Sequence, residues 1–132
     1  MKKFKYSKGF KYITREQIIQ ICDILPLGLW VDHELITLEP SRIIIKERYA
    51  WDGPSGLTID TKNTHYPSLI HDAFYQLMRE GYLDSKIYRK AVDDLFLELL
   101  KEEGMCYLRR MLWYKMVRKY GAKYASKKKV KL

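Results

Sequence analysis

The first part of the chain begins with the pattern of a short helix. Thr14 followed three residues later by Gln17 has the form of a capping box, and apolar side chains recur after it up to residue 24. Pro26, which cannot continue a helix, ends the pattern. We therefore expect a short N-terminal helix that begins at Thr14 and stops before Pro26.

Short runs of β-branched and aromatic residues follow, and these runs predict strands. They cover residues 29–31, 35–38 and 42–49, and the turn-forming groups DHE and EPS separate them. Side chains of this kind favour strands, and strands joined by short turns pair with their neighbours. The sequence thus predicts a small antiparallel β-meander with one face in solvent.

A long loop and three helices complete the pattern. Residues 51–67, WDGPSGLTIDTKNTHYP, are of the types found in loops, and a loop this long inside a compact domain is usually functional. Helices are expected at about 68–80, 85–103 and 105–120, each followed by a glycine: Gly81, Gly104 and Gly121. Strands followed by helices predict an α+β fold, in which a short connection makes the first two helices antiparallel neighbours.

Length and composition indicate one domain, residues 1–132. With 47% hydrophobic residues, a chain of this length forms a core without a disulfide or a metal. No apolar run approaches the roughly 20 residues that cross a bilayer, and no apolar segment follows the basic N-terminus, so we expect neither a membrane span nor a signal peptide. Cys22 and Cys106 lack metal-ligand spacing, and we expect two buried free thiols in a cytoplasmic or virion protein.

The net charge of +9 is concentrated at the two ends of the chain. Residues 1–12, a basic N-terminal arm, carry five lysines and no acid. Residues 104–132, which include a Lys-rich tail at 126–132, carry ten Lys and Arg and no acid. Basic residues interleaved with aromatic ones suit nucleic acid or an anionic membrane surface, so residues 105–132 are a candidate binding segment. The alternative is a solvated helix face, with Trp113 and Tyr114 in the core.

A candidate general base lies on the first helix after the long loop. His71 and Tyr75 are one helical turn apart, and Asp93 on the antiparallel second helix is expected to meet them across the interface. A carboxylate on one imidazole nitrogen leaves the other nitrogen as a base. Asp72 is rotated by about 100° toward the loop, where a carboxylate beside backbone carbonyls suits calcium. The alternative is a buried histidine that is simply paired with a core carboxylate.

Most of the chain resembles a family of small proteins of unknown function encoded by tailed phages and prophages. The matching signatures lie between about residues 27 and 121: WDGPSGLTIDT (51–61), SLIHDAFYQLMREG (68–81), VDDLF (92–96), and a run through Gly104, Met105, Arg109, Tyr114, Arg118 and Gly121. The resemblance implies a phage-derived accessory or virion-associated protein, in the cytoplasm of the bacterial host or in the virion. Virion proteins are then expected partners.

Residues 51–96 are also similar to phospholipase A2, including the form found in parvovirus capsid proteins. The shared features are a glycine 18 residues before the histidine, HDxxY on one helix and an Asp on the antiparallel helix. The resemblance implies a Ca²⁺-dependent phospholipid esterase that aids membrane passage. In such an enzyme His71 activates a water molecule, and Asp93 with Tyr75 orients the imidazole. Four residues would hold Ca²⁺: Trp51, Gly53 and Ser55 through their backbone carbonyls, and Asp72 through its carboxylate.

Overall fold

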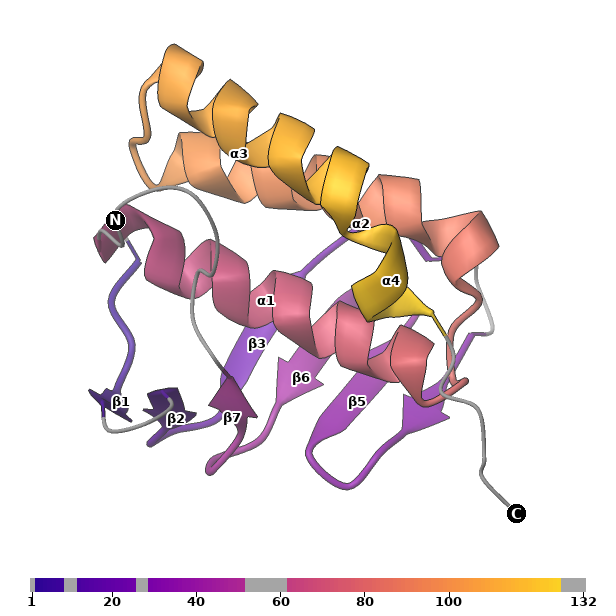
Figure 1. The fold of residues 1–132 in the computed structure, drawn as a ribbon. Coiled ribbons are helices and arrows are strands. Elements are labelled where there is room, and N and C mark those ends of the chain that lie inside the picture. Colours follow the sequence, from indigo (N-terminus) through magenta and orange to yellow (C-terminus); the bar gives the residue numbers. More distant parts are fainter. Residues whose placement is uncertain (1, 9–11, 26–28, 52–61, 127–132) are drawn as a thin grey trace.

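The structure, a computed structural model, describes residues 2–8, 12–25, 29–51 and 62–126 (Figure 1). The strands in these ranges are β1 (Tyr6–Lys8), β2 (Tyr12–Thr14), β3 (Ile18–Ile21), β4 (Val31–Asp32), β5 (Ile36–Glu39), β6 (Arg42–Ile45) and β7 (Ala50–Trp51). The helices are α1 (Lys62–Arg79), α2 (Ser85–Glu102), α3 (Tyr107–Tyr120) and α4 (Ala122–Ala125). This order, strands and then helices, confirms the predicted α+β fold. Within the described ranges, no helix combines the length and the apolar character needed to cross a membrane.

The predicted meander is part of a four-stranded antiparallel sheet with the order β3-β6-β5-β4. Strands β5 and β6 pair in the register Ile36↔Ile45 and Leu38↔Ile43, and all four of these side chains are completely buried. They alternate with less buried residues, as expected for a sheet with one face on the core. A second, three-stranded sheet with the order β1-β2-β7 ends at Trp51, where the chain approaches α1.

The predicted N-terminal helix is wrong. Residues 14–25 contain the end of β2 and the whole of β3, which pairs antiparallel with β6. Thr14 is not a helix cap, because its buried hydroxyl donates to the Lys46 carbonyl (3.0 Å) and accepts from the Tyr49 N–H (2.9 Å). The isoleucines of β3 favour an extended chain and find a partner strand in β6. Pairing with a distant segment therefore outweighs the local capping signal.

The second correction concerns the long loop predicted at 51–67. Helix α1 begins at Lys62 rather than after Pro67, and Pro67 lies inside the helix. Thr64, Tyr66 and Pro67 are buried, so packing stabilises a helical turn that local propensity disfavours. Residues 52–61 lie outside the described part of the chain, and the loop prediction for them is not tested.

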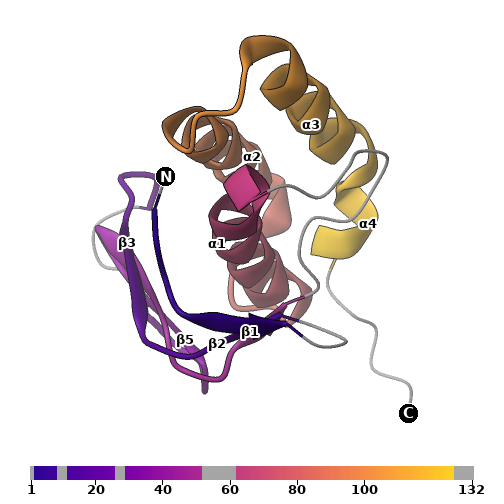
Figure 2. The same cartoon turned by 90° about the vertical axis from the view of Figure 1, so that its left-hand side faces the viewer.

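Helix α1 lies between the sheet and the other helices (Figures 1 and 2). Helix α2 runs along α1, α3 lies along α2, and the short α4 returns to contact α1. The glycines predicted after α1 and α2 are confirmed, because Gly81 and Gly104 follow these helices with positive φ angles of 83° and 87°. The Asp84 side chain caps α2 by accepting from the Lys86 N–H (2.9 Å). One face of α1 thus meets the sheet, while another meets α2, where the candidate base lies.

Candidate functional site

The structure brings His71, Tyr75 and Asp93 together between α1 and α2. The His71 Nε2 lies 2.8 Å from the Asp93 Oδ1, and the Tyr75 hydroxyl donates to the same oxygen at 2.6 Å. The His71 and Tyr75 rings lie against each other, with centroids 4.1 Å apart. Both geometric predictions, the shared helix face and the histidine–carboxylate hydrogen bond, are therefore confirmed.

The charge of Asp93 determines which nitrogen of His71 carries the proton. Burial raises the pKa of Asp93, but hydrogen bonds from His71, Tyr75 and Arg118 outweigh burial and hold the pKa below its ordinary value. An ionised carboxylate only accepts hydrogen bonds, so both the Nε2 and the tyrosine hydroxyl donate. Burial, followed by the hydrogen bond to Asp93, raises the pKa of Tyr75, which keeps this hydroxyl protonated. When His71 is neutral, its lone pair is consequently on Nδ1.

Two arginines that the sequence analysis did not place in the site complete the surroundings of Asp93. The Arg118 Nη1 of α3 donates to the Asp93 Oδ2 at 2.7 Å. The Arg89 Nε of α2 lies 3.7 Å from the same oxygen and donates to the Tyr75 hydroxyl at 3.1 Å. Arg89 also donates to the carbonyls of Val117 and Arg118, at 2.8 and 2.7 Å. The fully buried Asp93 thereby connects α1, α2 and α3.

A local signal existed for one of these arginines. Arg89 precedes Asp93 by four residues on α2, a spacing that places both on one helix face. Arg118 is far from Asp93 in sequence, and only the packing of α3 brings it into contact. However, Arg118 and Gly121 both belong to the run of residues on which the predicted resemblance to a phage family rests. In space both lie beside the network around Tyr75, because a Cβ on Gly121 would be 2.7 Å from the Tyr75 hydroxyl.

Part of the proposed calcium site can be located in the structure. Asp72 is half-buried on α1. The Trp51 indole donates to the Ser68 hydroxyl at 3.1 Å, and Ser68 lies one turn before Asp72 on the same face of α1. The Trp51 side chain therefore lies against the turn of α1 that precedes Asp72. Gly53 and Ser55 lie outside the described residues.

The donor chemistry of these residues fits a hard cation. One carboxylate and several backbone carbonyls are oxygen ligands of the kind that Ca²⁺ takes. Among the described residues, no three His, Cys, Asp or Glu side chains gather in a way that could hold a metal ion. A site here would thus depend on carbonyls more than on side chains. The Trp51 side chain itself is buried against Phe4, Tyr6 and Tyr12, so it also fills the junction between the small sheet and α1.

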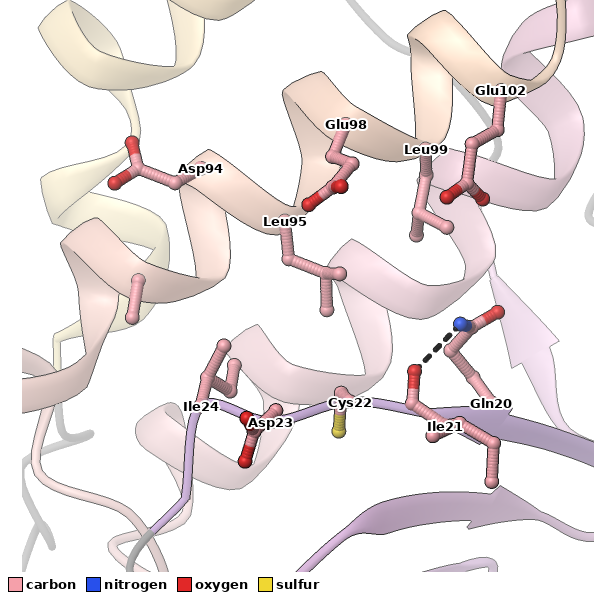
Figure 3. Close-up of a pocket in the computed structure, with 11 residues that line it drawn as sticks. Gln20, Ile21, Cys22, Asp23, Ile24, Asp94, Leu95, Glu98, Leu99 and Glu102 are labelled. Carbon is pink, nitrogen blue, oxygen red and sulfur yellow. Dashed lines mark hydrogen bonds between the residues drawn. The ribbon is translucent and has the colours of Figure 1, made fainter.

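A separate groove of about 390 Å³ lies between α2 and residues 20–24 (Figure 3). Acidic side chains of α2, including Glu98 and Glu102, line it, and none of its described lining residues is a histidine. Cys22 is one of the lining residues, but its sulfur points away from α2 (Figure 3). The thiol is buried, as predicted, and burial raises its pKa to about 11. The thiol stays protonated at neutral pH and is a poor nucleophile. The candidate site is therefore at His71 and not in this groove.

One prediction for the third helix is wrong, because Cys106 is exposed rather than buried. Leu108, two residues further along, is 81% exposed. Met105 and Trp113 are buried, so the alternative of a core Trp113 is confirmed. Tyr114 is half-buried, with its hydroxyl on the Asp94 carboxylate. The face of α3 that carries Trp113 and Arg118 is therefore turned inward, and the face that carries Leu108 is exposed.

Comparisons of the chain with protein-family models, with curated proteins and with solved structures give no match. The resemblances to the phage family and to phospholipase A2 remain predictions from the sequence motifs. A function has to be argued from the geometry around His71.

Proposed function

We propose that His71 is the general base of an ester-hydrolysing centre of the phospholipase A2 kind, in a phage-derived accessory or virion-associated protein. The single observation that carries the proposal is the hydrogen bond from the His71 Nε2 to the buried, ionised Asp93. This bond places the lone pair on Nδ1, and Nδ1 makes no hydrogen bond to any described residue. In the proposal, Nδ1 is the nitrogen that takes a proton from water.

The proposed reaction uses the two nitrogens of His71 in different ways. Nδ1 removes a proton from water while the water oxygen attacks the ester carbonyl carbon, whose oxygen becomes negative. Asp93 stabilises the imidazolium that forms, and Tyr75 and Arg118 hold Asp93 in place. The imidazolium then returns the proton to the alkoxide oxygen as the ester C–O bond breaks, which leaves a carboxylic acid and an alcohol.

Calcium has a defined place in this proposal. Its residues would be Asp72, through the carboxylate, and Trp51, Gly53 and Ser55, through backbone carbonyls. Ca²⁺ held by these residues would supply positive charge that polarises the ester carbonyl and offsets the negative charge on its oxygen. The Gly53 N–H would assist at the same oxygen.

A second candidate is a non-catalytic pocket that serves structure or binding in such an accessory protein. The hydrogen bond from Arg118 to Asp93 favours it, because the same carboxylate that orients His71 also joins α3 to α1 and α2. Buried polar networks of this kind can specify how helices pack without any chemistry. The two candidates differ in whether His71 is needed for a reaction or only for the fold.

Fatty-acid release from phospholipid vesicles distinguishes them. We expect hydrolysis by the wild type in millimolar Ca²⁺ and none in a chelator. His71→Ala should lower the rate by about 10²- to 10⁴-fold, the usual contribution of a general base. His33→Ala is the matched control, since His33 pairs with Glu80 away from the site, at 3.2 Å, and its loss should leave the rate unchanged.

Asp72 supplies the second part of this test. Asp72→Asn keeps the shape of the side chain and removes its charge, so it should abolish the rise in melting temperature that Ca²⁺ produces in the wild type. His71→Ala should retain that rise, because His71 is not a ligand in the proposed site. No hydrolysis by the wild type, together with a melting temperature that does not respond to Ca²⁺, would overturn the enzymatic proposal and favour the non-catalytic pocket.

A further inference from the structure

The outer face of α3 carries a continuous row of exposed side chains. Leu108, Leu112, Lys115 and Lys119 are spaced by four, three and four residues, which places them on one side of the helix. All four are exposed, Leu108 to 81%. The exposed Lys123 of α4 lies just beyond this row along the chain. We call these five residues the outer stripe.

The inner face of α3 explains why the outer stripe stays free. Trp113 is buried, and Arg118 is held by Asp93. Figures 1 and 2 show α3 lying along α2, on the side away from the sheet. The inner face thus holds α3 against the rest of the protein, and the outer face is exposed to solvent.

The lysines of the outer stripe have no acidic partner in the described part of the chain. Lys115, Lys119 and Lys123 make no ion pair there, although Lys119 and Lys123 lie over the rings of Tyr120 and Tyr124. The sequence from residue 104 onward contains no Asp or Glu. The arginines of the same helix are different, because Arg118 is used internally by Asp93. The outer stripe therefore carries uncompensated positive charge.

We propose that the outer stripe binds the surface of a bilayer that contains anionic phospholipids. Lysines attract the lipid phosphates, and exposed tyrosines such as Tyr120 and Tyr124 suit the level of the headgroups. The two leucines decide between a membrane and a nucleic acid. A phosphate backbone would need the lysines but would leave Leu108 and Leu112 in water, whereas the boundary between headgroups and acyl chains takes up apolar side chains.

This binding goes beyond the proposed function, because it requires no reaction at His71. The outer stripe and the Asp93 network use opposite faces of the same helix. Vesicle binding can therefore be measured on the wild type in a chelator, in which the proposed hydrolysis does not occur, and binding should be retained there. The failure of either proposal can then be recognised without the other.

The test measures sedimentation of the protein with vesicles of phosphatidylcholine, with and without phosphatidylglycerol. We expect binding to the anionic vesicles that weakens with added salt. Replacing Lys115, Lys119 and Lys123 by Gln should weaken it by about 100-fold at low salt, since each lysine near an anionic surface contributes roughly fivefold. The matched control replaces three exposed lysines elsewhere, Lys62, Lys86 and Lys101, by Gln and should retain most of the binding.

The leucines give the second arm of the test. Leu108→Ser with Leu112→Ser should weaken vesicle binding and leave any binding to a DNA duplex unchanged. Both side chains are exposed, so the variants should fold, as circular dichroism and melting will show. The proposal is overturned if the wild type does not bind anionic vesicles, if the lysine and control triples behave alike, or if the leucines have no effect. Tight DNA binding with leucine-independent vesicle binding would point to nucleic acid instead.

Discussion

Asp93 is a fully buried carboxylate that accepts hydrogen bonds on both oxygens. Oδ1 accepts from His71 and Tyr75, and Oδ2 accepts from Arg118. A buried charge is tolerated only when it is paired and hydrogen-bonded, so the removal of one partner leaves the others uncompensated. The same contacts that orient the imidazole therefore also contribute to stability.

The lowered pKa of Asp93 predicts a specific loss of stability in acid. Because the pKa is lower in the folded than in the unfolded protein, the stabilisation is complete above the unfolded value of about 4 and is lost as pH falls through the folded value. Asp93→Asn should lower the free energy of unfolding at pH 7 by about 3 kcal/mol. The difference in the free energy of unfolding between the wild type and Asp93→Asn should shrink toward pH 2 in urea titrations.

The control is Asp94→Asn, which removes an exposed ion pair with Lys90. It should lower the free energy of unfolding much less at pH 7. An equal pH slope for wild type and Asp93→Asn would contradict the ionised state of Asp93.

At the scale of elements, α3 ends where it touches the network of α1 and α2. Gly121 follows α3, and its Cα lies beside the Tyr75 hydroxyl and the Arg89 guanidinium. Its φ of −73° is open to any residue, so the glycine is required by close approach and not by backbone conformation. Gly104, between α2 and α3, is the opposite case. Its φ is +87°, and an added Cβ would have no atom within 4 Å.

This contrast predicts different effects for two similar substitutions. Gly121→Ala would place a Cβ 2.7 Å from the Tyr75 hydroxyl and 3.2 Å from the Arg89 Nη2, besides the Val117 carbonyl. It should destabilise the protein by about 1–3 kcal/mol and also reduce ester hydrolysis, because Tyr75 must move. Gly104→Ala should lower the free energy of unfolding by about 1–2 kcal/mol, because residue 104 has a left-handed backbone conformation that alanine disfavours. It should leave ester hydrolysis unchanged. Thermal melts and vesicle hydrolysis measure both effects, and equal hydrolysis by the two variants would count against the link from α3 to the site.

At the scale of the whole molecule, the features that could be predicted are those that depend on residues close together in the sequence. The glycines that follow α1 and α2, the β5–β6 pair and the meeting of His71, Tyr75 and Asp93 follow from short-range patterns. The capping signal at Thr14, in contrast, was misleading. The pairing of β3 with β6 was missed, because a distant strand decides it. The start of α1 before Pro67 was missed because burial of its first residues, and not local propensity, stabilises that turn. Arg118 and the exposed face of α3 depend on how the helices pack, which no local signal in one sequence encodes.

The protonation of the His71 ring is the most direct test of the central claim, that Asp93 leaves Nδ1 as a base. In ¹⁵N-labelled protein at a pH where the ring is neutral, we expect the Nε2 resonance to show a bound proton and the Nδ1 resonance to show none. Asp93→Asn, in which an amide replaces the carboxylate, should weaken this preference. A wild-type ring that carries its proton on Nδ1 would contradict the hydrogen bond from Nε2 to Asp93, and with it the general base.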